Sequence, residues 1–137
     1  MLRPVADKFK IASPYGVRTH PVTNELNSFH KGVDFACPVG TPVVACFDGT
    51  ILSIKSKHDE NPAGNRLWLY CGTHRAGYFH LDDDGVRVKP DQRVKAGELL
   101  AFSGATGRVS GPHLHFQLEN LKTLHHEQPI FEEQNLG

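Results

Sequence analysis

Residues 103–116 read Ser-Gly-Ala-Thr-Gly-Arg-Val-Ser-Gly-Pro-His-Leu-His-Phe, a glycine-rich loop that leads into a strand. Successive side chains of a strand point to opposite faces, so His113 and His115 share one face while Leu114 and Phe116 share the other. The alternation of polar and apolar residues continues through the next three positions. This pattern predicts a half-buried strand in an antiparallel sheet, with two imidazoles on its polar face.

A second motif, His30-Lys-Gly-Val-Asp34, contains a histidine and an aspartate four residues apart. The glycine inside the motif and a proline shortly after it favour an extended segment over a helix. If His30, Asp34 and His115 converge, two neutral imidazoles and one carboxylate form a ligand set suited to one zinc ion. Three protein ligands leave the fourth tetrahedral position for water, which is the pattern of catalytic zinc sites.

Amide hydrolysis also needs groups that accept and deliver protons. His113 and His80 are the candidates, because imidazole titrates near pH 7 and His113 shares a strand face with His115. Each feature alone also occurs on ordinary protein surfaces, since exposed histidines are common on sheet faces. The combination of the two motifs, with Gly-Pro ahead of the second, favours a functional site.

Short apolar stretches alternate with turns over the rest of the chain. Strands are expected at residues 50–54, 66–71, 77–81 and 99–102, with a hairpin-type turn at Asp48-Gly49 before the first of them. Residues 13–30 predict loop with at most a short strand, and residues 121–137 predict a loose or short helical end. No convincing amphipathic helix is visible. The sequence therefore predicts an all-β protein, a compact antiparallel sheet or sandwich.

Length and composition narrow the function. The 137 residues suffice for a single domain over residues 1–137, and 15 basic against 15 acidic residues disfavour a nucleic-acid partner. No signal peptide or membrane-spanning stretch is visible, so neither export by a standard signal nor membrane insertion is expected, and a monomer is the default. The three cysteines, Cys37, Cys46 and Cys71, are expected to be buried free thiols. The remaining histidines are expected in a solvated tail (His125, His126) or in surface loops (His20, His58, His74).

Several motifs occur in a fixed order: residues 13–21, 30–34, 40–43, 78–81 and 103–116. With these motifs, residues 11–119 resemble the catalytic domain of lysostaphin/LytM-type zinc endopeptidases, which hydrolyse bacterial peptidoglycan. The resemblance implies a compact antiparallel sheet, of the duplicated-hybrid-motif kind, with a groove walled by loops, and a C-terminal extension over residues 120–137. It also implies roles: His30, Asp34 and His115 match the ligands of one zinc ion per chain, and His80 and His113 match two catalytic histidines that do not bind the metal.

The resemblance implies an endopeptidase that acts on peptidoglycan stem peptides or cross-bridges, with D-Ala to diaminopimelate cross-links preferred over glycine bridges. The acidic run at residues 82–84 and a short turn after Cys71 lie where groove walls are expected and leave the substrate preference open. Two alternatives remain: a histidine phosphotransfer domain of similar β architecture, and a non-catalytic wall-binding module that activates other hydrolases. We expect action at the bacterial cell wall, either as a phage-encoded lysin or as a domain excised from an exported protein.

Overall fold

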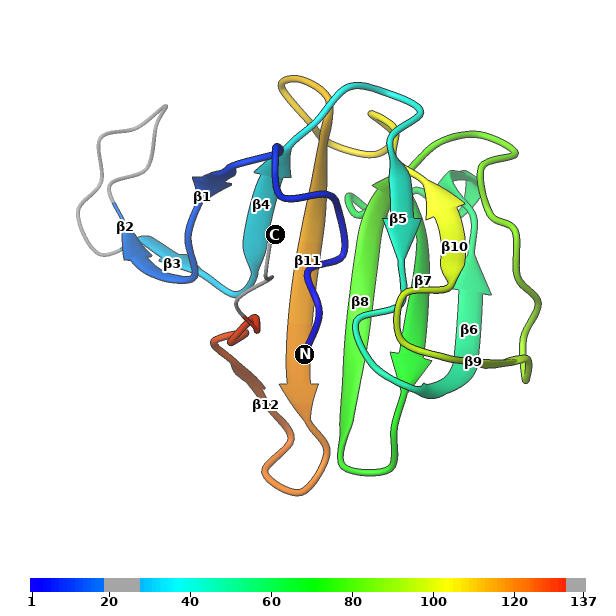
Figure 1. The fold of residues 1–137 in the computed structure, drawn as a ribbon. Coiled ribbons are helices and arrows are strands. Elements are labelled where there is room, and N and C mark those ends of the chain that lie inside the picture. The colour runs from blue at the N-terminus through cyan, green and yellow to red at the C-terminus, as the bar shows by residue number, and fades with distance from the viewer. Residues whose placement is uncertain (19–27, 133–137) are drawn as a thin grey trace.

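A computed structural model describes residues 1–18 and 28–132, and it is built almost entirely of antiparallel strands (Figure 1). The main sheet has the strand order β1 (Ile11–Ser13), β4 (Val33–Ala36), β11 (His113–Asn120), β8 (His74–Leu81), β7 (Asn65–Tyr70), β6 (Gly49–Lys55) and β9 (Arg93–Val94), and β12 (His125–Glu127) also pairs with β11. Two small sheets pair β5 (Pro42–Val44) with β10 (Leu99–Phe102) and β2 (Gly16–Arg18) with β3 (Ser28–His30). The all-β antiparallel prediction is confirmed.

The core lies between the main sheet and the small β5–β10 sheet, which lies in front of the β7 part of the main sheet in Figure 1. The apolar side of β11 faces this core: Leu114 and Phe116 are fully buried, while His113 and His115 on the other side are partly exposed. Strands β8 and β7 likewise have one face against the core, and their buried residues include Tyr78 and Leu69. Burial of one face only explains the alternation seen in the sequence, and it leaves the polar face for the functional residues.

The only helix among the described residues is a short 3-10 turn, η1 (Lys57–Asp59). Nothing in this part of the chain forms a helix that is long and apolar enough to cross a membrane.

Three expectations about local structure are wrong. The Asp48-Gly49 turn does not join a hairpin, because β5 pairs with β10 and β6 pairs with β7 and β9; the Asp48 carboxylate instead accepts a hydrogen bond from the Ala96 backbone N–H at 2.8 Å. The described residues among the first thirty include three short strands instead of at most one. The C-terminal segment adds the strand β12 to the sheet, so His125 and His126 do not lie in a solvated tail. Strands of three residues are too short to show a periodicity in the sequence.

The cysteine prediction is confirmed in part. Cys37 and Cys46 are buried free thiols, whereas Cys71 is exposed because it follows the end of β7. Of the histidines expected on the surface, His58 is exposed in η1, and His74 lies half-buried in β8 with its ring 2.9 Å from Glu127. His20 lies outside the described residues.

Candidate metal centre and active site

Three strands bring the first two motifs together. His30 ends β3, Asp34 lies in β4, and His115 lies in β11 directly opposite Asp34. The Asp34 carboxylate is 3.3 Å from His30 Nε2 and 2.8 Å from His115 Nδ1, and these two ring nitrogens are 3.3 Å apart. All three ligand atoms lie within 4.8 Å of one another, as a shared metal ion requires. Residues 81 positions apart in sequence therefore meet at one point.

The neighbours of both histidines fix which ring nitrogen is free. The Pro14 carbonyl oxygen lies 3.0 Å from His30 Nδ1, and a carbonyl only accepts, so Nδ1 carries the hydrogen and Nε2 keeps its lone pair. His115 has the opposite arrangement, because its Nε2 donates to Gln117 Oε1 at 3.0 Å and its Nδ1 faces Asp34. The Gln117 amide is oriented in turn by a 2.9 Å hydrogen bond from its Nε2 to Glu119.

In these tautomers, two imidazole lone pairs and a carboxylate point at the same small volume. Three acceptors this close together repel one another unless a cation lies between them. Burial would raise the pKa of Asp34, but in the metal-free protein protonation of the neighbouring His115 and His30 rings outweighs it and holds the pKa below its usual range, a role that a bound cation takes over when the rings are neutral. The carboxylate is therefore ionised at neutral pH, and the donor set fits a divalent metal that prefers nitrogen and oxygen ligands.

His113 and His80 lie beside this cluster. His113 Nε2 is 3.8 Å from the Asp34 carboxylate, and the His80 ring centroid lies 4.8 Å from that of His113 and 6.4 Å from that of His115. The Nδ1 atoms of His113 and His80 face the carbonyl oxygens of Gly111 and Thr106, at 3.0 and 2.8 Å. Both rings therefore carry their hydrogen on Nδ1 and keep a free Nε2 when neutral.

The backbone at His80 explains how its ring comes to lie beside His113. Tyr78 and Leu81 are both fully buried although they are three residues apart, which a regular strand does not allow. His80 lies between them with φ of 63°, in the left-handed region that costs a non-glycine residue roughly 1–2 kcal/mol. This irregularity shifts the alternation of β8 by one residue, and such bulges often redirect a side chain next to an active site.

Burial lowers the pKa of His80 to about 4, the nearby His113 acts in the same direction, and the hydrogen bond to Thr106 opposes them only in part. His80 is therefore neutral at pH 7. Thr106 is itself fixed, because its hydroxyl donates to the Leu81 carbonyl at 2.6 Å and accepts from the Asn65 N–H at 3.1 Å. The loop of residues 103–112 also meets the loop of residues 56–64, where the Arg108 N–H donates to the Pro62 carbonyl at 2.8 Å, and the His80 N–H donates to the Ala63 carbonyl at 2.8 Å. These contacts hold the His80 ring in one orientation.

Comparison with known proteins identifies the family. Residues 28–129, which include all five candidate residues, match peptidase family M23. The chain belongs to this family. The predicted resemblance to lysostaphin/LytM-type catalytic domains is thereby confirmed.

The curated relatives of this M23 chain include the peptidoglycan DD-endopeptidase ShyA of Vibrio cholerae, 41% identical over 118 residues, which are 84% of this chain and 26% of ShyA. Another is the glycyl-glycine endopeptidase ALE-1 of Staphylococcus capitis, 44% identical over 64% of this chain and 24% of ALE-1. The chain therefore spans about a quarter of the length of these relatives.

Solved structures share the fold. A zinc-containing peptidase from Vibrio cholerae is 34% identical with a TM-score of 0.78, covering 94% of this chain and 39% of that one. The catalytic domain of lysostaphin from Staphylococcus simulans is 32% identical with a TM-score of 0.76, and 90% of each chain is covered. The antiparallel architecture of the M23 chain is thus that of the lysostaphin catalytic domain.

Sequence reasoning missed three residues of the candidate site. Gln117 contacts His115, Thr106 contacts His80, and the Phe79 ring stacks on the His115 ring with centroids 5.0 Å apart. Gln117 lies two residues after His115 on the same strand face, so the alternation could have identified it. Phe79 and Thr106 reach the site through strand pairing and loop packing, which a single sequence does not reveal.

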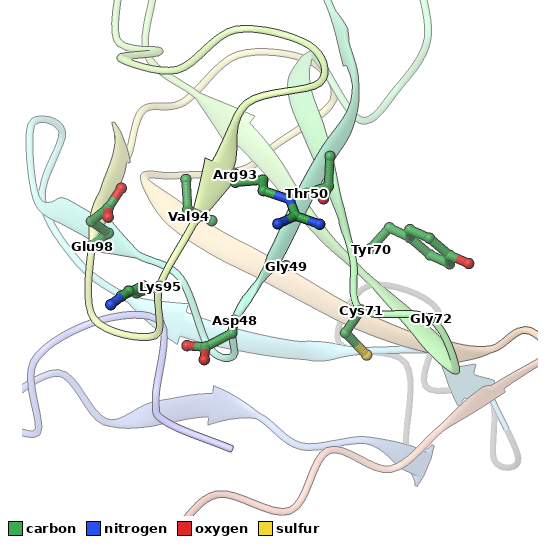
Figure 2. Close-up of a pocket in the computed structure, with 10 residues that line it drawn as sticks. All are labelled: Asp48, Gly49, Thr50, Tyr70, Cys71, Gly72, Arg93, Val94, Lys95 and Glu98. Carbon is green, nitrogen blue, oxygen red and sulfur yellow. The ribbon is translucent and has the colours of Figure 1, made fainter.

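The cavity in Figure 2 lies away from this site. It has a volume of about 560 Å³, and its walls come from the ends of β6 and β7 and from the segment around β9. None of the five candidate residues lines it. Its side chains have mixed charge and do not extend the M23 site.

Proposed function

We propose that this M23 chain is a zinc-dependent endopeptidase that hydrolyses peptide cross-links of bacterial peptidoglycan. One observation carries the proposal: His30, Asp34 and His115 converge with their free acceptor atoms directed at one point, as a bound cation requires. Membership of family M23 supports peptidase chemistry, and the names of ShyA and ALE-1 support a wall peptide as the substrate.

In this proposal, zinc is held by His30 Nε2, an Asp34 oxygen and His115 Nδ1. Two neutral imidazoles and one carboxylate leave the ion with a net charge of about +1, so it remains a strong Lewis acid. When bound, zinc makes a water molecule acidic enough to act as a nucleophile near neutral pH and stabilises the charge that develops on the amide oxygen.

His80 and His113 would handle the protons. With Nδ1 bound to a carbonyl, each ring offers Nε2 as an acceptor toward the metal centre. His80 is neutral at pH 7, so its Nε2 would be free to take a proton from the attacking water, although the lowered pKa makes it a weak base. The proton would pass to the leaving amine through His113, whose ring centroid lies 4.8 Å from that of His80 and whose Nε2 lies 3.8 Å from Asp34.

Peptidoglycan as a substrate places the action of this chain at the bacterial cell wall. We propose a phage-encoded lysin, or a domain of an exported wall enzyme, as its biological setting. No interaction with nucleic acid and no membrane insertion belong to this proposal, and the protein acts as a monomer.

The test is digestion of purified peptidoglycan, followed by mass spectrometry of the released muropeptides. We expect new amine and acid termini at a peptide cross-link, loss of turnover with a chelator, and recovery when zinc is added back. His115→Ala should bind no zinc and release nothing, whereas His58→Ala, which changes an exposed histidine in η1, should behave like wild type. Zinc binding without release would support the non-catalytic activator, and phosphorylation of a strand histidine that does not require His30 or Asp34 would support phosphotransfer.

A further inference from the structure

The metal centre occupies one end of a longer face of the main sheet. Directly paired residues of neighbouring strands share a face, so the strand register defines three rows of side chains across β4, β11, β8 and β7. The rows are Asp34, His115 and Phe79; then Gln117, Gly77 and Trp68; then Glu119, Arg75 and Tyr70. The core lies on the opposite side, so we call this side the open face.

Aromatic rings continue the metal centre along the open face. Phe79 stacks on His115, with centroids 5.0 Å apart and planes 20° apart, and Trp68 meets Phe79 edge-on at 5.5 Å. The Arg75 guanidinium carbon lies 4.1 Å from the centre of the Trp68 ring, a close cation–π distance. Phe79, Trp68 and Arg75 therefore form one continuous strip, which we call the open-face strip.

Gly77 makes the strip possible. A Cβ atom at this position would lie 2.8 Å from both the Phe79 and the Trp68 rings, so only a glycine lets the two rings meet over the backbone. Trp68 and Phe79 are only partly buried, although they are among the largest apolar side chains of the molecule. Partly exposed aromatic surface that is continuous with a catalytic centre is typical of a ligand-binding surface.

The far end of the strip carries a positive charge that is fixed in place. Arg75 donates through Nε and Nη2 to Glu119 at 3.0 and 2.8 Å, and Glu119 also accepts from Gln117, so the pair is rigid. Among the described residues, Arg75 Nη1 has no hydrogen-bond partner, and about a third of the side chain is exposed. A rigid guanidinium with a free donor edge is well suited to bind a carboxylate.

The strip has the length of a short peptide. Glu119, opposite Arg75, lies four residues along β11 from His115, or roughly 13 Å at the usual rise of a strand. An extended peptide covers this distance with about four residues. A peptide whose scissile bond lies at the metal centre would thus bring a residue three or four positions away to Arg75.

We propose that the open-face strip binds an acidic stem peptide of peptidoglycan, with Arg75 pairing a free carboxylate and the Phe79 and Trp68 rings contacting the apolar part of the chain. This inference rests on the proposed function and narrows its substrate class. In the stem peptide L-Ala-γ-D-Glu-meso-diaminopimelate-D-Ala, the third residue counted back from the cross-linked D-Ala carbonyl is D-Glu, which carries a free carboxylate, whereas glycine bridges carry none. The charge of Glu119 does not oppose binding, because Arg75 and Gln117 already compensate it.

The test uses the single tryptophan of the chain, Trp68, whose fluorescence reports directly on the strip. The zinc-loaded protein is titrated with the tetrapeptide L-Ala-γ-D-Glu-meso-diaminopimelate-D-Ala, with the same peptide after amidation of its carboxylates, and with pentaglycine. We expect Trp68 fluorescence to change with the acidic peptide and its affinity to exceed that of the other two by about tenfold, the value of one charge-assisted hydrogen bond. Arg75→Gln should abolish the preference, whereas Arg93→Gln, an exposed arginine in β9, should retain it.

Each outcome separates this inference from the proposed function. Equal affinities of the wild-type protein for the acidic and the amidated peptide would overturn the inference. An Arg75→Gln protein that still prefers the acidic peptide would also overturn it. Binding of the acidic peptide without cleavage of cross-linked peptidoglycan would overturn the proposed function and leave the strip in place. Bound zinc, measured in each variant, shows that the metal centre is unchanged.

Discussion

His80 and His113 lie on neighbouring strands with ring centroids 4.8 Å apart, and each donates its Nδ1 hydrogen to a backbone carbonyl oxygen. The two carbonyl oxygens thus hold both imidazole rings in the tautomer with the hydrogen on Nδ1, although the rings belong to different strands. Because both carbonyls belong to the loop that precedes β11, this one loop sets the orientation of both histidines. Three of the five candidate residues, His30, His80 and His113, thus have their rings oriented by backbone carbonyl oxygens.

The lowered pKa of His80 predicts how stability depends on pH. Because the folded pKa of about 4 lies below the ordinary value of 6.5, the unfolded chain binds this proton first as the pH falls. His80 therefore has no effect on stability above about pH 6.5 and destabilises the folded state progressively between about pH 6.5 and pH 4. We expect the metal-free protein to lose more unfolding free energy between pH 7 and pH 4.5 than His80→Asn does, as measured by urea denaturation.

Asparagine is the right replacement at this position because it tolerates the left-handed φ of 63°. His58→Asn, at an exposed site, serves as the control and should keep the wild-type pH dependence. An equally steep loss of stability in His80→Asn would show that other groups cause it.

Gln117 is expected to determine metal affinity through His115. Gln117→Leu removes the acceptor for His115 Nε2–H, so the ring can rotate or change tautomer, and loss of such a partner typically weakens metal binding about 10–100-fold. Gln117→Glu keeps an acceptor for His115 but loses the hydrogen bond to Glu119, so its zinc affinity should lie between those of Gln117→Leu and wild type. Competition with a chromogenic chelator measures both affinities, and equal zinc binding by Gln117→Leu would contradict the assignment.

The sequence allowed the fold class to be predicted, and it drew attention to the motifs that contain the candidate metal ligands, because both depend on local patterns. The alternation around His113 and His115 follows from burial of one strand face, and the ordered motifs identified the family. The partners of these residues could not be predicted in the same way. Phe79 lies against His115 only because β8 pairs with β11 in this register. The position of His80 depends on a bulge in β8, and no residue type in the sequence predicts this bulge.

Errors of the sequence analysis are concentrated in the short strands. Three-residue strands such as β5 and β12 form because a partner strand is available, so tertiary pairing and not local propensity decides them. His126 illustrates the consequence. The sequence predicts a solvated tail for this residue, yet its Nδ1 lies 2.7 Å from the Tyr15 hydroxyl, in hydrogen-bond contact with a residue 111 positions away.

The three cysteines should differ sharply in reactivity. Cys71 is exposed, whereas Cys37 and Cys46 are buried, and burial raises the pKa of Cys46 to about 12, so little thiolate forms there. We expect one thiol per chain to react rapidly with a disulfide reagent in the native protein and all three to react after denaturation. Cys71→Ser should remove the rapid reaction, and a second fast thiol would contradict the burial of Cys37 or Cys46.

Two glycines of the loop before β11 provide a matched pair for testing how the loop holds His80. At Gly107, φ is 81° and a Cβ atom would lie 2.3 Å from the Pro62 carbonyl oxygen, whereas a Cβ atom at Gly111 meets nothing within 4 Å. Gly107→Ala should force the two loops apart and cost about 1–3 kcal/mol of unfolding free energy. Gly111→Ala should be close to neutral.

The same pair tests the link from loop to catalysis. Thr106 is the neighbour of Gly107 and supplies the carbonyl that fixes the His80 ring, so Gly107→Ala should also displace this ring. We expect kcat for hydrolysis of cross-linked peptidoglycan to fall roughly tenfold to a hundredfold in Gly107→Ala, because small misplacements of catalytic groups are costly. Bound zinc should remain at the wild-type level, since none of the three ligands contacts this loop segment through Gly107. A Gly107→Ala protein that is less stable but fully active would show that the orientation of His80 does not depend on the two loops meeting.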